Sequence, residues 1–309
     1  MRIEQELAVA APQRDTLLTV GVFDGVHAGH HHLLETLKLR AADRSLLSGV
    51  VTFNPHPQSV LHPDNELPWL SDIEDRVRSI RELGIDLVVV LTFTKEVALL
   101  TPQQFVTMMK THLKMRGIVV GPDFALGQGR AGSIDQLREL GRQLVFSVEA
   151  VAQYTANGDA VSSTLIRQAL AEGNTRKVHA MMGRYFQIKG IVITSAKRGR
   201  RLGFPTANID IRPQQALPGD GIYATIADAD GRRFASATYV GARPTFGDMR
   251  RTVEAYLLNY EGDLYGRELK LEFVQKVRDE QRFASAEELK RQIDRDVREV
   301  RAILGEDLR

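Results

Sequence analysis

The first half of the chain alternates short β-rich runs with longer runs of helical periodicity, and this alternation limits the possible folds more than any other feature. A repeated strand–helix–strand pattern predicts a parallel sheet with helices on both faces, which binds ligands at the carboxyl ends of its strands. Thr101 followed by Pro102 is a favourable helix start, and Ser71 with Glu74 is expected to form a capping box. The predicted strands are 17–23, 48–53, 86–91, 117–120 and 144–148, and the predicted helices lie near 29–40, 72–83, 102–113 and 134–141.

The pattern changes after Gly183. From there the runs are short, alternating and separated by turns, which predicts an antiparallel barrel or sandwich. A helix over 285–304 closes the chain, and the charges along it are expected to form a solvated face. We therefore expect an α/β domain with a Rossmann-like parallel sheet over 1–182 and a β-barrel domain with a terminal helix over 183–309. The predicted strands of this half are 186–194, 221–228, 232–239, 252–258 and 268–277.

Composition excludes several classes of protein. The chain has 309 residues, enough for two domains, and its 41 Lys plus Arg nearly balance 39 Asp plus Glu, so no basic field favours nucleic acid. It contains no cysteine, has no signal-peptide pattern at its start and has no apolar run long enough to cross a membrane. These observations predict a soluble cytoplasmic protein without nucleic-acid or membrane partners, and they leave self-association open.

The most specific motif is the turn from Gly21 to His30, Gly-Val-Phe-Asp-Gly-Val-His-Ala-Gly-His. It joins a predicted strand to a predicted helix, so backbone N–H groups and the positive end of a helix dipole converge there, an arrangement that suits phosphate. His27 and His30 add side-chain donors. The alternative is an ordinary strand–turn–helix with solvated histidines.

Three further polar clusters follow predicted strands or open a helix. The Pro-rich turn 53–57 holds His56 rigidly, and the Gly-rich loop 121–132 allows a ligand to approach the backbone. The hydroxyls of 162–164, with Arg167 one turn later, can bind a phosphate together. By spacing alone, a plain Pro-rich turn explains 53–57 as well as a binding site does. Simple helix capping explains the hydroxyls of 162–164 better than phosphate binding does.

In the second half the stretch 199–209 is the informative one. Thr206 and Asn208 lie two apart on an extended segment and therefore face the same way. Both supply neutral oxygen ligands, which suit a Mg²⁺ that keeps water and phosphate oxygens. By itself, the pattern fits a structural turn better.

These motifs together resemble one family. His27-Ala28-Gly29-His30 is similar to the signature of the nucleotidyltransferase superfamily, and the whole turn resembles that of bacterial bifunctional riboflavin kinase/FAD synthetases. Further motifs of this family are matched in the same order, over about residues 15–300. They are loops 53–57 and 121–132, the helix start at 161–167 and the Pro-Thr-Ala-Asn segment at 205–208. One departure is Ala125-Leu126, where the family has Arg-Phe.

The resemblance implies two ATP-dependent reactions: phosphorylation of riboflavin to FMN in the barrel, and adenylylation of FMN to FAD, with release of pyrophosphate, in the α/β domain. It implies Mg²⁺ with ATP as co-substrate. The implied catalytic residues are Glu254, His27, His30 and Arg167. The implied ATP-binding residues are Gly21, Phe23, Asp24, Gly25, Gly29, Ser163, Thr164, Gly199, Arg201, Gly203 and Pro205. The implied flavin-binding residues are Asn54, His56, Pro57, Asp123, Phe124, Arg130 and Arg278, and the implied metal ligands are Thr206 and Asn208.

Two alternatives stay open at this point. One is a single-activity kinase or adenylyltransferase with one degenerate site, and the changed Ala125-Leu126 makes the first half the more suspect. The other is a non-catalytic flavin-binding regulator. The retained Glu254, Thr206 and Asn208 argue against a regulator, because flavin binding alone requires no site for Mg²⁺ and ATP.

Overall fold

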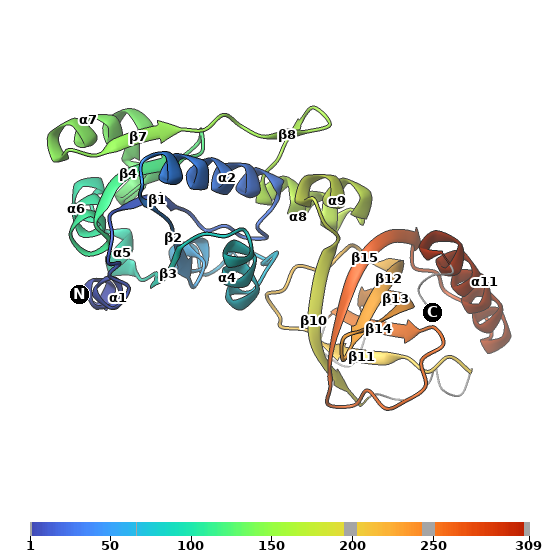
Figure 1. Ribbon diagram of the computed structural model, residues 1–309. Helices are drawn as coiled ribbons and strands as arrows, with labels where there is room; N and C mark the ends of the chain where they lie inside the picture. Colours follow the sequence, from blue (N-terminus) through green and yellow to red (C-terminus); the bar gives the residue numbers. More distant parts are fainter. Residues whose placement is uncertain (1, 66, 195–202, 243–250, 306–309) are drawn as a thin grey trace. The chain divides into compact units, whose positions relative to one another are not determined.

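A computed structural model describes residues 2–65, 67–194, 203–242 and 251–305 (Figure 1). The chain divides into two compact units, Met1–Ser163 and Thr164–Arg309. Each unit has its own sheet and core, so each is described by itself. Within the described ranges, no helix is long and apolar enough to cross a membrane.

The first unit is built on a five-stranded parallel sheet in the order β3-β2-β1-β4-β7. Helices cover both faces of this sheet, as the alternating pattern predicted. Its strands are β1 (Thr16–Val20), β2 (Leu47–Asn54), β3 (Leu87–Thr92), β4 (Met115–Val120) and β7 (Ser147–Ala150). Its helices are α1 (Arg2–Val9), α2 (Ala28–Asp43), α3 (Pro57–Leu61), α4 (Ile73–Glu82), α5 (Lys95–Ala98), α6 (Pro102–Leu113) and α7 (Ile134–Leu144). Short pairs β5 (Ala125–Leu126) with β6 (Gly132–Ser133) and β8 (Thr155–Ala156) with β9 (Asp159–Ala160) complete the unit.

Strand alternation divides the core of this unit into two layers. On β1, Leu18 belongs to a cluster with α1, α6 and α7, whereas Leu17 belongs to a cluster with α2 and α4. Burying apolar side chains on both faces fixes the sheet between the helix layers, so the ends of its strands are held in place.

The second unit is a closed antiparallel barrel, so the prediction of a barrel is confirmed and the sandwich is excluded. The strand order around it is β10-β11-β14-β13-β12-β15 (Figure 1). The terminal helix α11 (Ala286–Leu304) packs on its outer surface, where Val300 meets Ala224, Ala235 and Leu258. The strands are β10 (Phe186–Ile193), β11 (Ala207–Asp210), β12 (Gly221–Ala229), β13 (Arg232–Ala242), β14 (Arg251–Leu257) and β15 (Glu268–Arg278), preceded by α8 (Ser163–Ala171) and α9 (Thr175–Met182).

Local sequence signals located most helix starts. Thr101 caps α6 in a capping box with Gln104, and Ser285 caps α11 by accepting from the N–H of Glu288. The expectation for Ser71 was wrong, because Asp72 caps α4 by accepting from the N–H of Asp75 at 2.7 Å. The Ser71 side chain is used elsewhere, at the histidine turn.

Candidate active sites

The histidine turn lies where the order of the parallel sheet reverses. β1 has β2 on one side and β4 on the other, and the turn follows β1 while the Gly-rich loop 121–132 follows β4 (Figure 1). The crevice at such a switch point, beyond the carboxyl ends of the strands, is where sheets of this kind bind ligands. The predicted phosphate-binding turn therefore occupies the position that the fold favours.

His27 and His30 cap the start of α2 for each other. Nδ1 of His27 accepts a hydrogen bond from the N–H of His30, and Nδ1 of His30 accepts one from the N–H of His27, both at 3.3 Å. Their rings stack with centroids 3.7 Å apart and an interplanar angle of 15°. The pair is thus a capping box built from two imidazoles.

This arrangement determines which ring nitrogen carries the proton of a neutral imidazole. Because each Nδ1 is an acceptor, the proton of each neutral ring lies on Nε2, which becomes a donor. Desolvation lowers the pKa of His30 well below its ordinary value, and electrostatic interactions, chiefly with His27 and Arg76, lower it further. His30 is therefore a neutral N–H donor at neutral pH, a form suited to hydrogen-bonding an anion.

The backbone of the turn is strained. Phe23 and Val26 adopt positive φ angles of 55° and 37°, a region that non-glycine residues seldom occupy. A Cβ on Gly29 would lie 3.2 Å from the His27 ring, so glycine lets this imidazole pack against the helix. Strain of this kind is maintained only where the surrounding contacts fix the conformation.

The Asp24 carboxylate supplies such contacts. It is 2% exposed and accepts hydrogen bonds from the N–H groups of Leu70 and Ser71, each at 3.1 Å. It also forms a buried ion pair with Arg76 at 3.5 Å. The Ser71 hydroxyl accepts from the N–H of Gly25 at 2.9 Å, which explains why it does not cap α4. These contacts attach the turn to the start of α4, and the predicted contact of Asp24 with ATP stays a prediction.

Ser163 also contacts the turn. Its hydroxyl donates to the backbone carbonyl of Asp24 at 3.0 Å, so the first residue of α8 is bonded to the Gly21–His30 segment. Thr164 and Arg167 follow on α8, in the part of the chain that groups with the second unit.

The predicted flavin-binding loops of the first unit also follow strands of the sheet. Asn54 ends β2, and His56 caps α3 through Nδ1, which accepts from the N–H of Gln58 at 3.1 Å, with Pro57 in the first helical position. After β4, Asp123 is exposed and Phe124 packs against the core. The Arg130 side chain lies outside the described set.

The departure at Ala125-Leu126 preserves the loop. Leu126 is buried in the core, and the two residues form β5, which pairs with β6. An apolar side chain therefore still anchors this loop.

The second cluster lies on one face of the barrel. Glu254 on β14 accepts a hydrogen bond from the Thr206 hydroxyl at 3.2 Å and lies directly opposite Asn208 on β11. Val253 and Ala255, on either side of Glu254, are buried, so Glu254 points to the opposite, outer face. The structure thus brings together the predicted base and both predicted metal ligands.

Arg278, at the end of β15, is held from α11. Its guanidinium donates to both carboxylate oxygens of Asp296, with Nε at 2.9 Å and 3.1 Å and Nη2 at 2.8 Å. Gln292 donates to the same carboxylate at 2.8 Å, and the Phe283 ring lies 5.7 Å from the guanidinium carbon. Asp296 is 3% exposed, so the expectation that the charges of this helix are all solvated was wrong at this residue.

Other predicted residues of the second half lie before β11 or outside the described ranges. Gly203 and Pro205 precede β11, and Phe204 between them contacts the Tyr256 ring edge-on, with centroids 5.4 Å apart. Gly199 and Arg201 lie outside the described residues.

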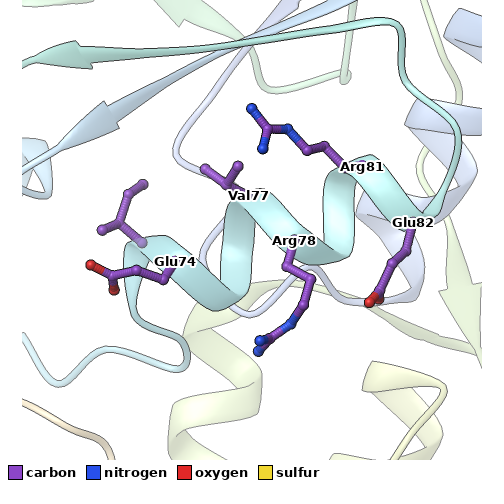
Figure 2. Close-up of a pocket in the computed structure, with 6 residues that line it drawn as sticks. Glu74, Val77, Arg78, Arg81 and Glu82 are labelled. Atoms are coloured by element: carbon purple, nitrogen blue, oxygen red, sulfur yellow. The ribbon is translucent and has the colours of Figure 1, made fainter.

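A shallow depression runs along α4, and none of the predicted site residues lines it (Figure 2). Two half-buried apolar residues, Ile73 and Val77, lie among its charged side chains. The buried Arg76 reaches the histidine turn from the same helix. The lining residues are Ile73, Glu74, Val77, Arg78, Arg81 and Glu82.

Comparison with known proteins assigns a family to each half of the chain. A family model for FAD synthetase matches residues 9–165, and one for riboflavin kinase matches residues 182–304. Bifunctional riboflavin kinase/FMN adenylyltransferases are similar over nearly the whole chain. The Escherichia coli K12 protein is 36% identical over 96% of this chain and 95% of its own. The Pseudomonas fluorescens protein is 37% identical over 94% and 93%, and the Bacillus subtilis protein is 33% identical over 93% and 92%.

Solved structures share the fold as well. One described as a macrolide-efflux protein from Streptococcus pneumoniae matches with a TM-score of 0.89 and 26% identity, over 97% of both chains. Both family models, and relatives more than 30% identical over nearly the whole chain, agree on one assignment. The chain belongs to the family of bifunctional riboflavin kinases/FMN adenylyltransferases.

Proposed function

We infer that this chain uses ATP twice on one flavin: it phosphorylates riboflavin to FMN and then transfers AMP to FMN, giving FAD and pyrophosphate. The observation that carries this inference is that both family models match, in order, and that each match contains one of the two polar clusters. The efflux description of the related structure is not carried over, because the relatives of higher identity are flavin enzymes.

In the kinase reaction Glu254 is the proposed general base. The terminal hydroxyl of the ribityl chain attacks the γ-phosphorus of ATP, Glu254 accepts the hydroxyl proton, and ADP leaves. Support comes from the position of Glu254, because the hydrogen bond from Thr206 orients its carboxylate on the outer face of β14.

Thr206 and Asn208 are the proposed ligands of a Mg²⁺ that accompanies ATP. The donors fit this ion, since a hydroxyl and an amide oxygen next to a carboxylate are hard oxygen ligands, and Mg²⁺ usually takes few protein ligands beside phosphate oxygens. When bound, Mg²⁺ would neutralise charge on the phosphates of ATP. Gly199, Arg201, Gly203 and Pro205 are proposed to cover those phosphates.

In the adenylyltransferase reaction a phosphate oxygen of FMN attacks the α-phosphorus of ATP and the bond to pyrophosphate breaks. Positioning and charge stabilisation provide most of the catalysis in such a reaction. We propose that the Nε2–H groups of His27 and His30, with Arg167, stabilise the charge that develops on the transferred group. The mutual capping of the two histidines supports this role, because it directs both donors away from the helix backbone.

The remaining assignments are proposals of the same kind. The loops at Asn54–Pro57 and Asp123–Arg130 are proposed to bind FMN in the first site, and Arg278 to lie beside riboflavin in the second. We propose that the functional domains are 1–182 and 183–309, although contacts within the chain group α8 and α9 with the barrel. A cytoplasmic location stays a prediction from sequence.

A chromatographic time course with riboflavin, ATP and Mg²⁺ tests the assignment. FMN that appears first and is followed by FAD supports both reactions in one chain. FMN without FAD in excess ATP would indicate a degenerate first site. Conversion of FMN to FAD without use of riboflavin would indicate a degenerate barrel site, and no product from either flavin would favour a flavin-binding regulator.

A further inference from the structure

We propose that Tyr239 binds the ribityl chain of riboflavin, with its hydroxyl oxygen accepting a hydrogen bond from a ribityl hydroxyl. This inference deepens the kinase assignment and rests on it. It assigns a residue that the sequence motifs did not single out, and it follows from the strand register of the barrel.

The register aligns the predicted kinase residues in one row across five strands. Asn208 lies opposite Glu254, and Glu254 lies opposite Tyr239. Tyr239 lies opposite Ile222, and Ile222 lies opposite Arg278. Residues directly opposite each other in antiparallel strands project to the same face, so Asn208, Glu254, Tyr239 and Ile222 share the outer face of the barrel. The pairing of β12 with β15 shifts by one residue between Ile222 and Tyr223, and the bonds of Arg278 to Asp296 of α11 place its side chain on the outer face as well.

Tyr239 occupies the middle of this row, between Glu254, the proposed base, and Arg278, which is proposed to lie beside riboflavin. Arg278 and Glu254 are three strand steps apart, a separation of about 14 Å at the usual strand spacing. Riboflavin is an elongated molecule with its ring at one end and its reacting hydroxyl at the other. If the ring lies near Arg278 and the reacting hydroxyl near Glu254, the ribityl chain crosses Tyr239.

The Tyr239 ring lies along its strand and does not project directly away from it. A Cβ added to Gly241, two residues further along the same face, would clash with the Tyr239 hydroxyl oxygen. Glycine at this position therefore leaves room for the tyrosine to lie flat on the barrel. Tyr239 remains half-buried, so part of the residue is accessible to a ligand.

The Tyr239 hydroxyl is oriented by Glu280, just beyond the end of β15. It donates to a carboxylate oxygen of Glu280 at 2.7 Å. A phenol that donates its only proton keeps lone pairs on oxygen, so it can accept from a hydroxyl group. Burial, and then the bond to Glu280, raise the pKa of the Tyr239 phenol well above its ordinary value, so it stays protonated at neutral pH. A ligand with several hydroxyl donors, such as a ribityl chain, fits this acceptor.

The test compares Tyr239→Phe with the unaltered full-length chain. We expect the KM for riboflavin to rise about three- to tenfold, the effect of one neutral hydrogen bond, while the KM for ATP and the adenylylation of FMN stay unchanged. Tyr260→Phe is the matched control, because Tyr260 packs edge-on against Phe234 outside the row. Tyr239→Ala should raise the KM for riboflavin further, since it removes the ring as well.

Riboflavin analogues that each lack one ribityl hydroxyl identify the bond. The analogue that lacks the hydroxyl bonded to Tyr239 should bind the unaltered chain more weakly than riboflavin does. Its affinity should not fall further in Tyr239→Phe, because the hydrogen bond is already absent. A KM for riboflavin unchanged by Tyr239→Phe, or additive losses for every analogue, would overturn this inference alone. Absence of riboflavin phosphorylation by the unaltered chain would overturn the kinase assignment and, with it, this inference.

Discussion

At the scale of single residues, His27 and His30 each use their two ring nitrogens differently. The Nδ1 atoms satisfy backbone N–H groups at the start of α2, and the Nε2 atoms carry the protons of the neutral rings. The capping role and the proposed anion-binding role therefore rest on different atoms, so substitution can separate them. Asn is a strong N-cap residue, and Gln is a natural partner at the third helical position.

The double variant His27→Asn/His30→Gln is expected to keep the helix start and lose the imidazole donors. Adenylylation of FMN should fall about 100-fold or more, the usual loss for donors to a charged transition state, with riboflavin phosphorylation unchanged. Initial rates of both reactions and the thermal midpoint measure this. Near-normal adenylylation in the folded variant would contradict the role given to these residues.

The lowered pKa of His30 predicts that the stability of the protein depends on pH. Its folded pKa lies below the ordinary value of about 6.5, so the unfolded chain binds more protons near and below that pH. The stabilising contribution of neutral His30 is complete above pH 6.5 and is lost as the pH falls toward the folded pKa. His30→Gln should therefore flatten the decline in unfolding free energy between pH 7 and pH 5.

Trp69 makes this measurement direct. It is the only tryptophan of the chain and precedes Leu70, whose N–H binds Asp24 beside the turn, so its fluorescence reports unfolding of the first unit. Equal slopes of unfolding free energy against pH for His30→Gln and the unaltered chain would contradict the prediction.

Glu254→Gln tests the other site. Glutamine keeps the size of the side chain and can still bond Thr206, but it is not a base at neutral pH. Riboflavin phosphorylation should fall by at least 100-fold, while adenylylation of supplied FMN stays normal. Glu268→Gln, at the exposed start of β15, serves as the control. Equal loss of both reactions, or of neither, would argue against Glu254 as the base.

At the scale of elements, α11 does more than cover the barrel. Its Asp296 holds Arg278, so the helix orients a residue proposed to lie beside riboflavin. We expect Asp296→Asn to lower the unfolding free energy by about 2 kcal/mol, less than for a fully buried pair because the Arg278 side chain keeps 17% of its exposure. The KM for riboflavin should rise, with the KM for ATP unchanged.

The exposed Asp294→Asn on the same helix is the matched control for this variant. Chemical denaturation and steady-state kinetics measure the two effects separately. Loss of stability without any change in the KM for riboflavin would show that the pair only holds the helix in place.

Elements with strong local signals could be predicted from the sequence, and those that depend on distant partners could not. The helix at Pro102–Leu113 was predicted residue by residue, because a cap, a proline and a clear period mark it. Strand β11 is only Ala207–Asp210 and was missed as a strand, because its pairing with β10 and β14 defines it. Ser71, Asp296 and Tyr239 were misread or missed for the same reason: their partners are far away in the sequence.

At the scale of the whole molecule, the histidine pair and the Glu254 cluster lie in different compact units, and the two proposed reactions share FMN as an intermediate. The variants above should therefore complement each other in solution. His27→Asn/His30→Gln alone should stop at FMN, and Glu254→Gln alone should not use riboflavin. An equimolar mixture should make FAD from riboflavin after a lag in which free FMN accumulates, as chromatography can follow. A mixture that makes FMN but no FAD would contradict this exchange.

The row from Asn208 to Arg278 limits which sequence changes this enzyme can accept during evolution. Its members come from five separate stretches of sequence, and only hydrogen-bond pairing between strands brings them into line. Loss of a single residue within β13 would turn Tyr239 toward the barrel interior while leaving every motif intact. Substitutions can adjust this surface one position at a time, whereas insertions and deletions within the strands would dismantle it. Length changes are therefore expected to accumulate in the turns.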